Sequence, residues 1–375
     1  MNAKDRDIFI ALSAVPEIGR QTLLRLRRCV RETTVSWSEI WNGSVFLWSQ
    51  LRLEVDQQEN FTVFRKTYTP ASYAEFLASK KIGVVVEGDP SYPSLLKQLP
   101  VKDRPLVLFV LGSCNFWDEI PVAVVGTRRP SVYGEFVTEK LTRELVFSGA
   151  TIISGFMYGV DLLAHQSAVR WGGKSVGVLG FGFDHCRRYP QRSARFVDEF
   201  LANGNVLVSE FTPEVEPSPG NFPVRNRIVA GLSHVVVVTE AAAKSGSLIT
   251  AERAAEYNRI VCAVPGLITS PMSDGTRALI NQGAKLVGSG AEILAELEWL
   301  SVKVKKAFPS SQKVFNTLEQ NMCDQLRSQP LSVDDLSRIL QKPINEISAT
   351  LTLLELKKMI RRDGWRWLFV GQIPL

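Results

Sequence analysis

The sequence has 375 residues, of which 45% are apolar and 22% are charged. These values are close to the average for globular proteins and exclude a disordered, collagenous or coiled-coil chain. At about 150 residues per domain, the length indicates two or three domains. The 44 lysines and arginines exceed the 38 acidic residues, and the resulting net charge of +6 permits a polyanionic partner without requiring one.

The five cysteines are scattered and odd in number, and no pair has CxxC spacing. We therefore expect no disulfide framework, no structural zinc site and a reducing compartment. The first residues, MNAKDRDIFIALSAVPEIG, lack the pattern of a signal peptide, and no apolar run approaches the ~20 residues that cross a membrane. These features predict a cytoplasmic protein without a membrane partner.

Residues 1–75 are predicted to form a helical domain. DIFIALSAV and TLLRLRRCV have apolar residues at helical spacing around a PEIG turn, and residues 70–80 indicate one more short helix. VPEIGRQTLLRLRRCVR also resembles the second half of a helix–hairpin–helix, in which a glycine turn and the following helix bind DNA phosphates. A solvated helix face explains its arginines equally well: Arg20, Arg25, Arg27, Arg28 and Arg31.

From about residue 80 to residue 300, β-branched runs alternate with helical stretches. The runs indicate buried strands at 83–89, 106–112, 122–126, 151–155, 175–180, 206–210, 234–240 and 259–266. Helical patterns cover 136–149, 159–172, 193–204 and 247–258. This alternation predicts an α/β domain with a mainly parallel sheet.

A short cationic segment at 301–313 reads as a linker, and residues 310–375 are predicted to form a third domain. LSVDDLSRIL indicates a helix capped by Ser332, and Pro343 suits the first turn of a second helix. RRDGWRWLFV then indicates a hairpin that turns at Asp363–Gly364. This order is typical of a winged helix. Its basic residues suit DNA, the dipole of a helix C-terminus or a protein-binding module: Lys357, Lys358, Arg361, Arg362 and Arg366.

Three of the predicted strands end in glycine-containing turns that lead into helices. In an open parallel sheet, such turns lie at the ligand-binding edge, where backbone N–H groups and helix dipoles attract anions. Glycine is also required by the geometry of such turns alone, which is the alternative explanation. The candidate residues are Gly126, Thr127, Arg128 and Arg129 in the first turn, Gly155 and Gly159 in the second, and Ser245, Gly246 and Ser247 in the third.

The segment GNFPVRNRIVAGL follows a stretch that holds four prolines between residues 213 and 223. The prolines make the loop extended and stiff, and the loop delivers a ring and two arginines to the start of a helix. An aromatic ring that stacks a base, beside guanidinium groups that hold phosphates, is typical of single-stranded nucleic acid binding. The candidates are Phe222, Arg225, Asn226 and Arg227. The alternative is a core Phe222 and an arginine-capped helix, although two arginines at a helix N-terminus need an anion to offset them.

Several enzyme motifs occur only in part. GGKS at 172–175 lacks the first glycine of a phosphate-binding loop, and it precedes a strand. GKSVG at 173–177 puts Ser175 at a strand start instead of a nucleophile elbow, and LGFGFD at 179–184 lacks the third glycine of a dinucleotide fingerprint. We therefore predict no catalytic residues, no cofactor and no metal site.

Six motifs identify a family resemblance. VVGTRRPSVYG, ISGFMYGVDLLAH, GNFPVRNRIVAGL, EAAAKSGSLITAERA, VCAVPG and TRALINQGAKLV occur in the order found in the DprA/Smf family, across about residues 82–290. The resemblance implies an extended Rossmann-like domain, flanked by an N-terminal SAM or helix–hairpin–helix-like domain and a C-terminal winged helix. It also implies a non-catalytic protein that binds single-stranded DNA, protects it and helps to load the RecA recombinase in natural transformation, acting as a homodimer.

By the same resemblance, the residues Gly126, Thr127 and Arg128 would form a phosphate pocket. Phe222, Arg225 and Arg227 would contact bases and backbone, and Lys244, Ser245, Gly246 and Ser247 would complete the wall. Three local departures from the family pattern are FMYG after Gly155, YPQRS with Ser193 in place of the usual asparagine, and a loop lengthened by HCRR.

Two other classes of protein fit parts of the sequence. The related lysine-decarboxylase-like phosphoribohydrolases process nucleotides, but their PGGxGTxxE loop is here AAAKSGSLITAE, in which Glu252 stands without the paired glycines. A DNA-binding regulator that acts through its winged helix is the other alternative.

Overall fold

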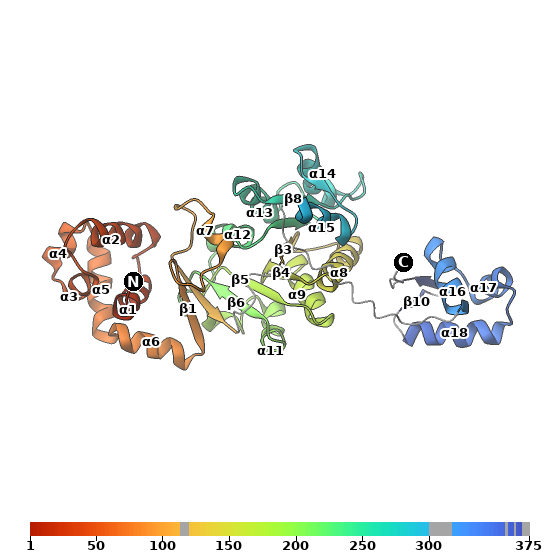
Figure 1. Cartoon of the computed structure of the whole chain (residues 1–375), viewed down its shortest axis with the longest axis horizontal. Coiled ribbons are helices and arrows are strands. Elements are labelled where there is room, and N and C mark those ends of the chain that lie inside the picture. The colour runs from red at the N-terminus through yellow and green to blue at the C-terminus, as the bar shows by residue number, and fades with distance from the viewer. Residues whose placement is uncertain (113–119, 300–316, 357–358, 364, 370–375) are drawn as a thin grey trace. The chain divides into compact units, whose positions relative to one another are not determined.

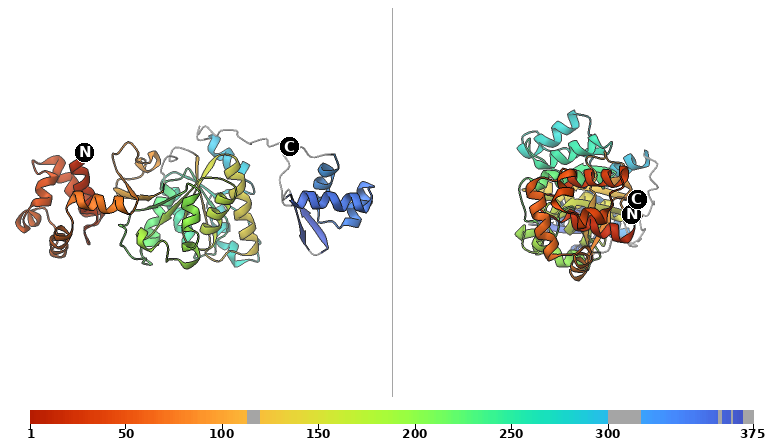
Figure 2. Two further views of the ribbon diagram at one scale, coloured as in Figure 1. Left: turned by 90° about the horizontal axis from the view of Figure 1, so that it is seen from below. Right: turned by 90° about the vertical axis from the view of Figure 1, so that its left-hand side faces the viewer.

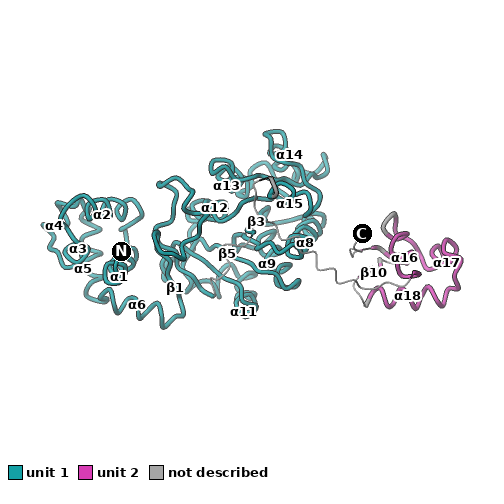
Figure 3. The backbone as a smooth tube through the Cα atoms, viewed as in Figure 1, with its two compact units in different colours: residues 1–306 teal, residues 307–375 magenta. Residues whose placement is uncertain are grey.

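The computed structural model of the chain describes residues 1–112, 120–299, 317–356, 359–363 and 365–369. The chain separates into two compact units, Met1–Lys306 and Ala307–Leu375, which are coloured separately in Figure 3. The linker predicted at 301–313 lies outside the described residues.

Six helices open the first unit. They are α1 Ala3–Ser13, α2 Arg20–Glu32, α3 Trp37–Asn42, α4 Val45–Gln50, α5 Val55–Thr67 and α6 Pro70–Ser79. The apolar spacing predicted α1, α2 and α6, whereas α3 to α5 were not assigned, because their sequences are rich in tryptophan, serine and polar residues. Local capping explains α3: the Ser36 side chain accepts from the Glu39 amide, and the Glu39 carboxylate accepts from the Ser36 amide.

A nine-stranded sheet forms the centre of the first unit. Its strands are β1 Ile82–Val86, β2 Val107–Leu111, β3 Ile120–Val125, β4 Ala150–Gly155, β5 Ser175–Leu179, β6 Val206–Ser209, β7 Val235–Val238, β8 Ile260–Ala263 and β9 Lys285–Leu286. The order is β1-β2-β6-β5-β4-β3-β7-β8-β9, and every pair is parallel except β1–β2 and β2–β6. The structure thus confirms the mainly parallel α/β fold. The two-residue β9 was not predicted.

Helices cover both faces of this sheet (Figures 1 and 2). They are α7 Ser94–Lys97, α8 Val132–Phe147, α9 Val160–Arg170, α10 Gln191–Ala194, α11 Val197–Ala202, α12 Asn221–Gly231, α13 Gly246–Glu256, α14 Asp274–Asn281 and α15 Gly290–Trp299, with short 3-10 turns at Phe183–His185 and Pro271–Ser273. Strand residues alternate between the faces: Val122 and Val124 of β3 pack with α8, α9 and α15, whereas Ala123 and Val125 pack with α12 and α13. The helix predicted at 193–204 is broken into α10 and α11.

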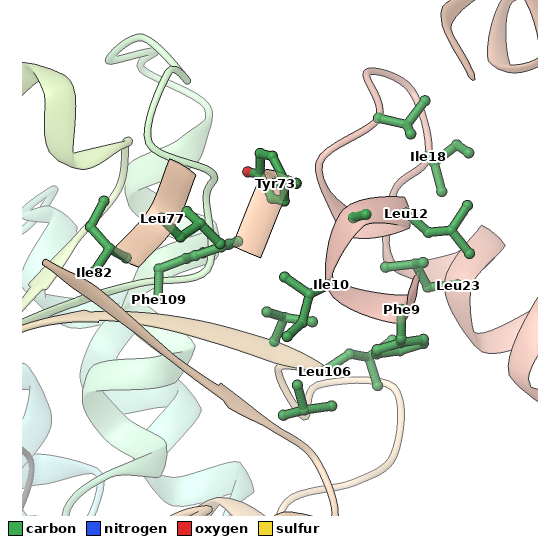
Figure 4. Close-up of a cluster of buried hydrophobic side chains, with 14 of the residues drawn as sticks. Phe9, Ile10, Leu12, Ile18, Leu23, Tyr73, Leu77, Ile82, Leu106 and Phe109 are labelled. Carbon is green, nitrogen blue, oxygen red and sulfur yellow. The ribbon is translucent and has the colours of Figure 1, made fainter. Parts of the chain in front are cut away.

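The N-terminal helices are joined to the sheet edge by a shared apolar cluster, part of which Figure 4 shows. Phe9 and Ile10 of α1, Leu77 of α6, Ile82 of β1 and Phe109 of β2 all belong to it. Ion pairs reinforce the junction, because Glu87 pairs with Arg27 at 2.6 Å and with Arg104 at 2.7 Å. Arg27, one of the helix–hairpin–helix candidates, is therefore already paired within the protein.

The second unit contains α16 Thr317–Ser328, α17 Val333–Leu340, α18 Ile344–Leu356, β10 Ile360–Asp363 and β11 Arg366–Phe369. Ser332 caps α17 as predicted, since its side chain accepts from the Asp335 amide. The strands β10 and β11 pair antiparallel, with Arg361 opposite Leu368, and form the predicted hairpin. Gly364, Lys357 and Lys358 lie outside the described residues. Within the described ranges, no helix of the protein is both long and apolar enough to span a membrane.

Candidate nucleic-acid interface

The three predicted turns follow β4, β3 and β7, which are neighbours in the sheet. They contact one another directly: the Val160 amide donates to the Thr127 carbonyl at 3.1 Å, and the Thr127 amide donates to the Glu240 carbonyl at 2.8 Å. Gly159 has φ +88°, and a Cβ there would lie 2.5 Å from the Thr127 oxygen, so this close approach requires glycine. The strand order changes direction beside β3, which makes this edge the switch point of the sheet.

A pocket of about 640 Å³ opens at this edge, between the turns and the adjacent helices α12 and α13. Its lining includes every predicted DNA-binding residue except Arg129 and Arg227. The predicted residues that line it are Gly126, Thr127, Arg128, Gly155, Phe222, Arg225, Asn226, Lys244, Ser245, Gly246 and Ser247. That these residues bind DNA stays a prediction.

Two cations at the pocket are solvent-exposed. The Arg128 guanidinium lies 5.5 Å from the centre of the Phe222 ring and 5.9 Å from that of Tyr158. Lys244 lies in the third turn, before α13. Within the described parts of the chain, neither Arg128 nor Lys244 makes an ion pair. Both are therefore available to an anion in the pocket.

Arg225, by contrast, is buried, with 3% of its surface exposed. Its Nη1 donates to the Val178 carbonyl, and its charge faces Asp161. Burial raises the pKa of Asp161, and the Arg225 guanidinium opposes that rise. A Cβ on Gly155 would lie 2.1 Å from Asp161 Oδ2 and 2.2 Å from Arg225 Nη1, so both groups pack directly on this glycine. The Asp161–Arg225 pair thus forms the floor of the pocket.

The remaining predicted polar residues of α12 are also held within the protein. Arg227 is 8% exposed, and its Nη2 donates to both carboxylate oxygens of Glu210, at 2.6 and 2.7 Å. Asn226 donates to the Gly246 carbonyl at 3.2 Å and so ties α12 to α13. The anion expected to offset the arginines of this helix is therefore supplied by Asp161 and Glu210.

Aromatic rings line the same pocket. Phe222 is half-buried, and its ring centre is 6.3 Å from that of Tyr189 and 6.4 Å from that of Phe181. The structure places Tyr158 and Tyr189 in the lining, and neither was predicted. Tyr158 directly precedes Gly159, the glycine that the turn requires. This position was the sequence signal that could have identified Tyr158 as a pocket residue. Met157, from the FMYG departure, is buried and lines the pocket as well.

Buried hydrogen bonds fix the turns from behind. His165 Nε2 donates to the Gly155 carbonyl at 2.6 Å, and its Nδ1 lies 2.7 Å from Ser175 Oγ. Burial lowers the pKa of His165 to about 4. Glu240 accepts from the Ser131 amide at 2.8 Å and from its hydroxyl at 2.6 Å, next to the start of α8. Ser131 also caps α8, since its side chain accepts from the Gly134 amide.

The partial enzyme motifs have structural positions. Ser175 is buried at the start of β5. Glu252, the carboxylate considered for nucleotide hydrolysis, is exposed on α13 and does not line the pocket. No group of three histidine, cysteine, aspartate or glutamate residues that could hold a metal ion occurs in the part of the chain that the structure describes.

The fold and the pocket define a class: an α/β protein with a cationic, ring-lined pocket at the switch point of its sheet. Residues 83–298 match the family described as DNA recombination-mediator protein A, and residues 308–364 match the DprA winged helix domain. The chain belongs to this DprA/Smf family, which confirms the predicted resemblance. The second match confirms the winged helix.

Individual relatives agree. Protein Smf of Escherichia coli (strain K12) is 34% identical over 361 residues, which are 94% of this chain and 92% of the relative. DNA processing protein DprA of Bacillus subtilis (strain 168) is 39% identical over 218 residues, which are 58% of this chain and 72% of the relative.

Two solved structures are similar as well. The X-ray structure of DNA processing protein A from Streptococcus pneumoniae has a TM-score of 0.64 and 32% identity, and the match covers 79% of this chain and 98% of that one. DNA processing protein A from Helicobacter pylori, whose structure concerns its single-stranded DNA binding mode, has a TM-score of 0.51 and 30% identity, with 58% and 96% covered.

Proposed function

We propose that this protein binds single-stranded DNA in the pocket at the switch point and acts as a recombination mediator without catalysing a reaction on the DNA. One observation carries the proposal: the pocket brings together two exposed cations, which make no ion pair within the described residues, a cluster of aromatic rings and the turns that follow the strands. The cations and the glycine-containing turns suit phosphates, and the aromatic rings suit the faces of unpaired bases.

We assign separate roles to the pocket residues. Arg128 and Lys244 hold phosphates, the backbone amides of Arg128 and Gly246 add neutral donors, and Phe222 stacks a base. Arg225 keeps the floor in place through Asp161. In a duplex the faces of the bases are stacked on one another and cannot stack on a protein ring. Aromatic rings in a pocket therefore favour a single strand.

The wider role rests on the family. Protection of the strand, delivery to RecA, homodimer formation, a part in natural transformation and a cytoplasmic location are all implied by membership. We propose that the chain has the domain organisation of the family. Residues 1–75 form a helical domain, residues 80–300 form the DNA-binding domain and residues 310–375 form the winged helix.

Fluorescence anisotropy with labelled oligothymidylate and with a duplex of equal length tests the proposal across a salt series. We expect preference for the single strand, with the logarithm of affinity falling by ~0.7 per log unit of salt for each phosphate contact. Binding that prefers the duplex, or that ignores salt, would contradict the proposal.

Removal of residues 310–375 separates the mediator from the winged-helix regulator. The mediator retains most of its single-strand affinity after this deletion, because the pocket lies in the first unit. A regulator loses its DNA binding instead. Release of free base from a panel of nucleotides would revive the phosphoribohydrolase alternative.

A further inference from the structure

A second depression of about 830 Å³ lies at the junction of α6 and β1, with Leu201 of α11 in its lining. Its walls come from three segments: residues 80–82 at the start of β1, residues 111–112 at the end of β2, and residues 183–188 after β5, with Leu201 of α11. No residue of this depression was part of the predicted DNA-binding set.

The walls of the depression are cationic. Two of the cations are paired with carboxylates: Lys80 contacts Asp184 at 2.5 Å, and Arg187 contacts Asp198 at 2.8 Å. The other two, Lys81 and Arg188, are exposed and make no ion pair within the described ranges of the chain. A net positive charge therefore remains for an anionic ligand.

The backbone fixes the position of Lys81. This residue follows the end of α6 with φ +57°, a left-handed conformation that often closes a helix, and its amide donates to the Ala78 carbonyl at 2.9 Å. The helix end thus holds Lys81 at the rim of the depression with its side chain exposed.

The two depressions meet at a single loop. Tyr189 lines the pocket at the switch point, and the preceding residues, Arg187 and Arg188, line the second depression. This loop contains the segment HCRR at 185–188. The consecutive residues 187–189 therefore contribute to both sites.

We propose that this second depression binds phosphate groups of the same single strand, beyond the pocket at the switch point, with Lys81 and Arg188 as the contacting cations. The proposal rests on the proposed function and extends it to a longer site. It assigns the HCRR loop a purpose, which is to lengthen the DNA path of this chain.

The test measures the affinity of the whole protein for oligothymidylates of about 4 to 16 nucleotides, the range of site sizes in single-strand binding folds. The variants are Lys81→Gly, Arg188→Ala and the double variant. We expect each to weaken binding of the long oligonucleotides by about tenfold while the shortest ones bind as before. For the double variant, the slope of the logarithm of affinity against the logarithm of salt concentration should become shallower by ~1.4, which is the value for two phosphate contacts.

Arg52→Gly is the matched control, because Arg52 is an exposed cation with φ +58° that lines neither depression. Both glycine variants should keep or raise the melting temperature, so a loss of binding in Lys81→Gly is not a loss of fold. Competition by thymidine monophosphate or inorganic phosphate distinguishes a free anion from a continuing strand. We expect neither to weaken the binding of the long oligonucleotide, whereas a depression that binds a free anion would lose its contribution to that affinity.

If the variants bind long oligonucleotides as well as the unaltered protein does, the inference fails and the proposed function stands. The inference also fails if short and long oligonucleotides lose affinity equally, or if free phosphate binds the depression without a strand. If the unaltered protein binds no single strand of any length, the proposed function itself fails.

Discussion

The two walls of the switch-point pocket carry cations of opposite character. On the side of the turns, Arg128 and Lys244 are exposed and unpaired within the described residues. On the side of α12, Arg225 and Arg227 are buried against Asp161 and Glu210. The difference teaches that charge alone does not identify a ligand contact, because a protein uses the same guanidinium to bind an anion or to hold its own carboxylate.

The strongest way to break this comparison is to remove Arg225. We expect Arg225→Met to lower the free energy of unfolding by about 3–5 kcal/mol, because the charge of Asp161 loses the guanidinium that faces it. Urea unfolding monitors the change. Adding Asp161→Asn should restore much of the stability. An Arg225→Met variant that keeps its stability and loses only DNA binding would contradict this expectation. Arg225 would then act as a DNA contact, like Arg128 and Lys244.

The buried side of the pocket can also be probed by pH. Because the pKa of His165 is lowered to about 4 in the folded protein, the unfolded chain binds the proton more readily and stability falls as the pH drops from about 6.5 to 4. The loss between pH 7 and pH 5 should be about 2 kcal/mol. In urea unfolding, the free energy of unfolding of His165→Gln should depend less on pH over this range than that of the unaltered protein. Burial also lowers the pKa of His234, which accounts for part of any remaining slope.

On the exposed side, we expect binding to change while stability does not. Arg128→Ala and Lys244→Ala should each cost about 1–3 kcal/mol of single-strand affinity, as for a lost hydrogen bond to a charged group. Arg170→Ala is the control for Arg128, since Arg170 is an exposed arginine at the far end of α9. Anisotropy measures the affinity. An unfolding midpoint that falls with the affinity would contradict the distinction between the two walls.

Arg129 should show the smallest effect. It is exposed, it adjoins Arg128 and it does not line the pocket. We expect Arg129→Ala to weaken binding by less than about 1 kcal/mol, because a cation at the rim acts through screened charge. A loss as large as that of Arg128→Ala would mean that the strand leaves the pocket across this residue.

Much of the fold could be predicted because its signals are local. The buried strands from β1 to β8 are β-branched runs, and the N-caps at Ser131 and Ser332 mark helix starts. The start of α3 carries a local signal as well, the Ser36–Glu39 capping box. The helices α4 and α5 could not be predicted in this way. Their stability comes from contacts such as that of Trp48, whose ring nitrogen donates to the Ile40 carbonyl eight residues earlier.

The segments that form the site could be predicted from the sequence. Which of their arginines are buried and paired within the protein could not. The need for an anion beside the arginines of α12 was visible in their position at a helix start. That the anions are Asp161 and Glu210 depends on the order of β4, β5 and β6 in the sheet, which periodicity does not encode. The second depression was missed for the same reason, since its three segments are distant in sequence.

The apolar cluster between the N-terminal helices and β1–β2 couples the folding of both parts. Phe9, Ile10 and Phe109 bury faces that would otherwise meet water, at about 1.5–3 kcal/mol for each side chain. Unfolding of α1 would therefore expose β2, through which the sheet edge is connected to β6. We expect one shared melting transition for the helices and the sheet, so a truncation before β1 would remove a structural support along with a module.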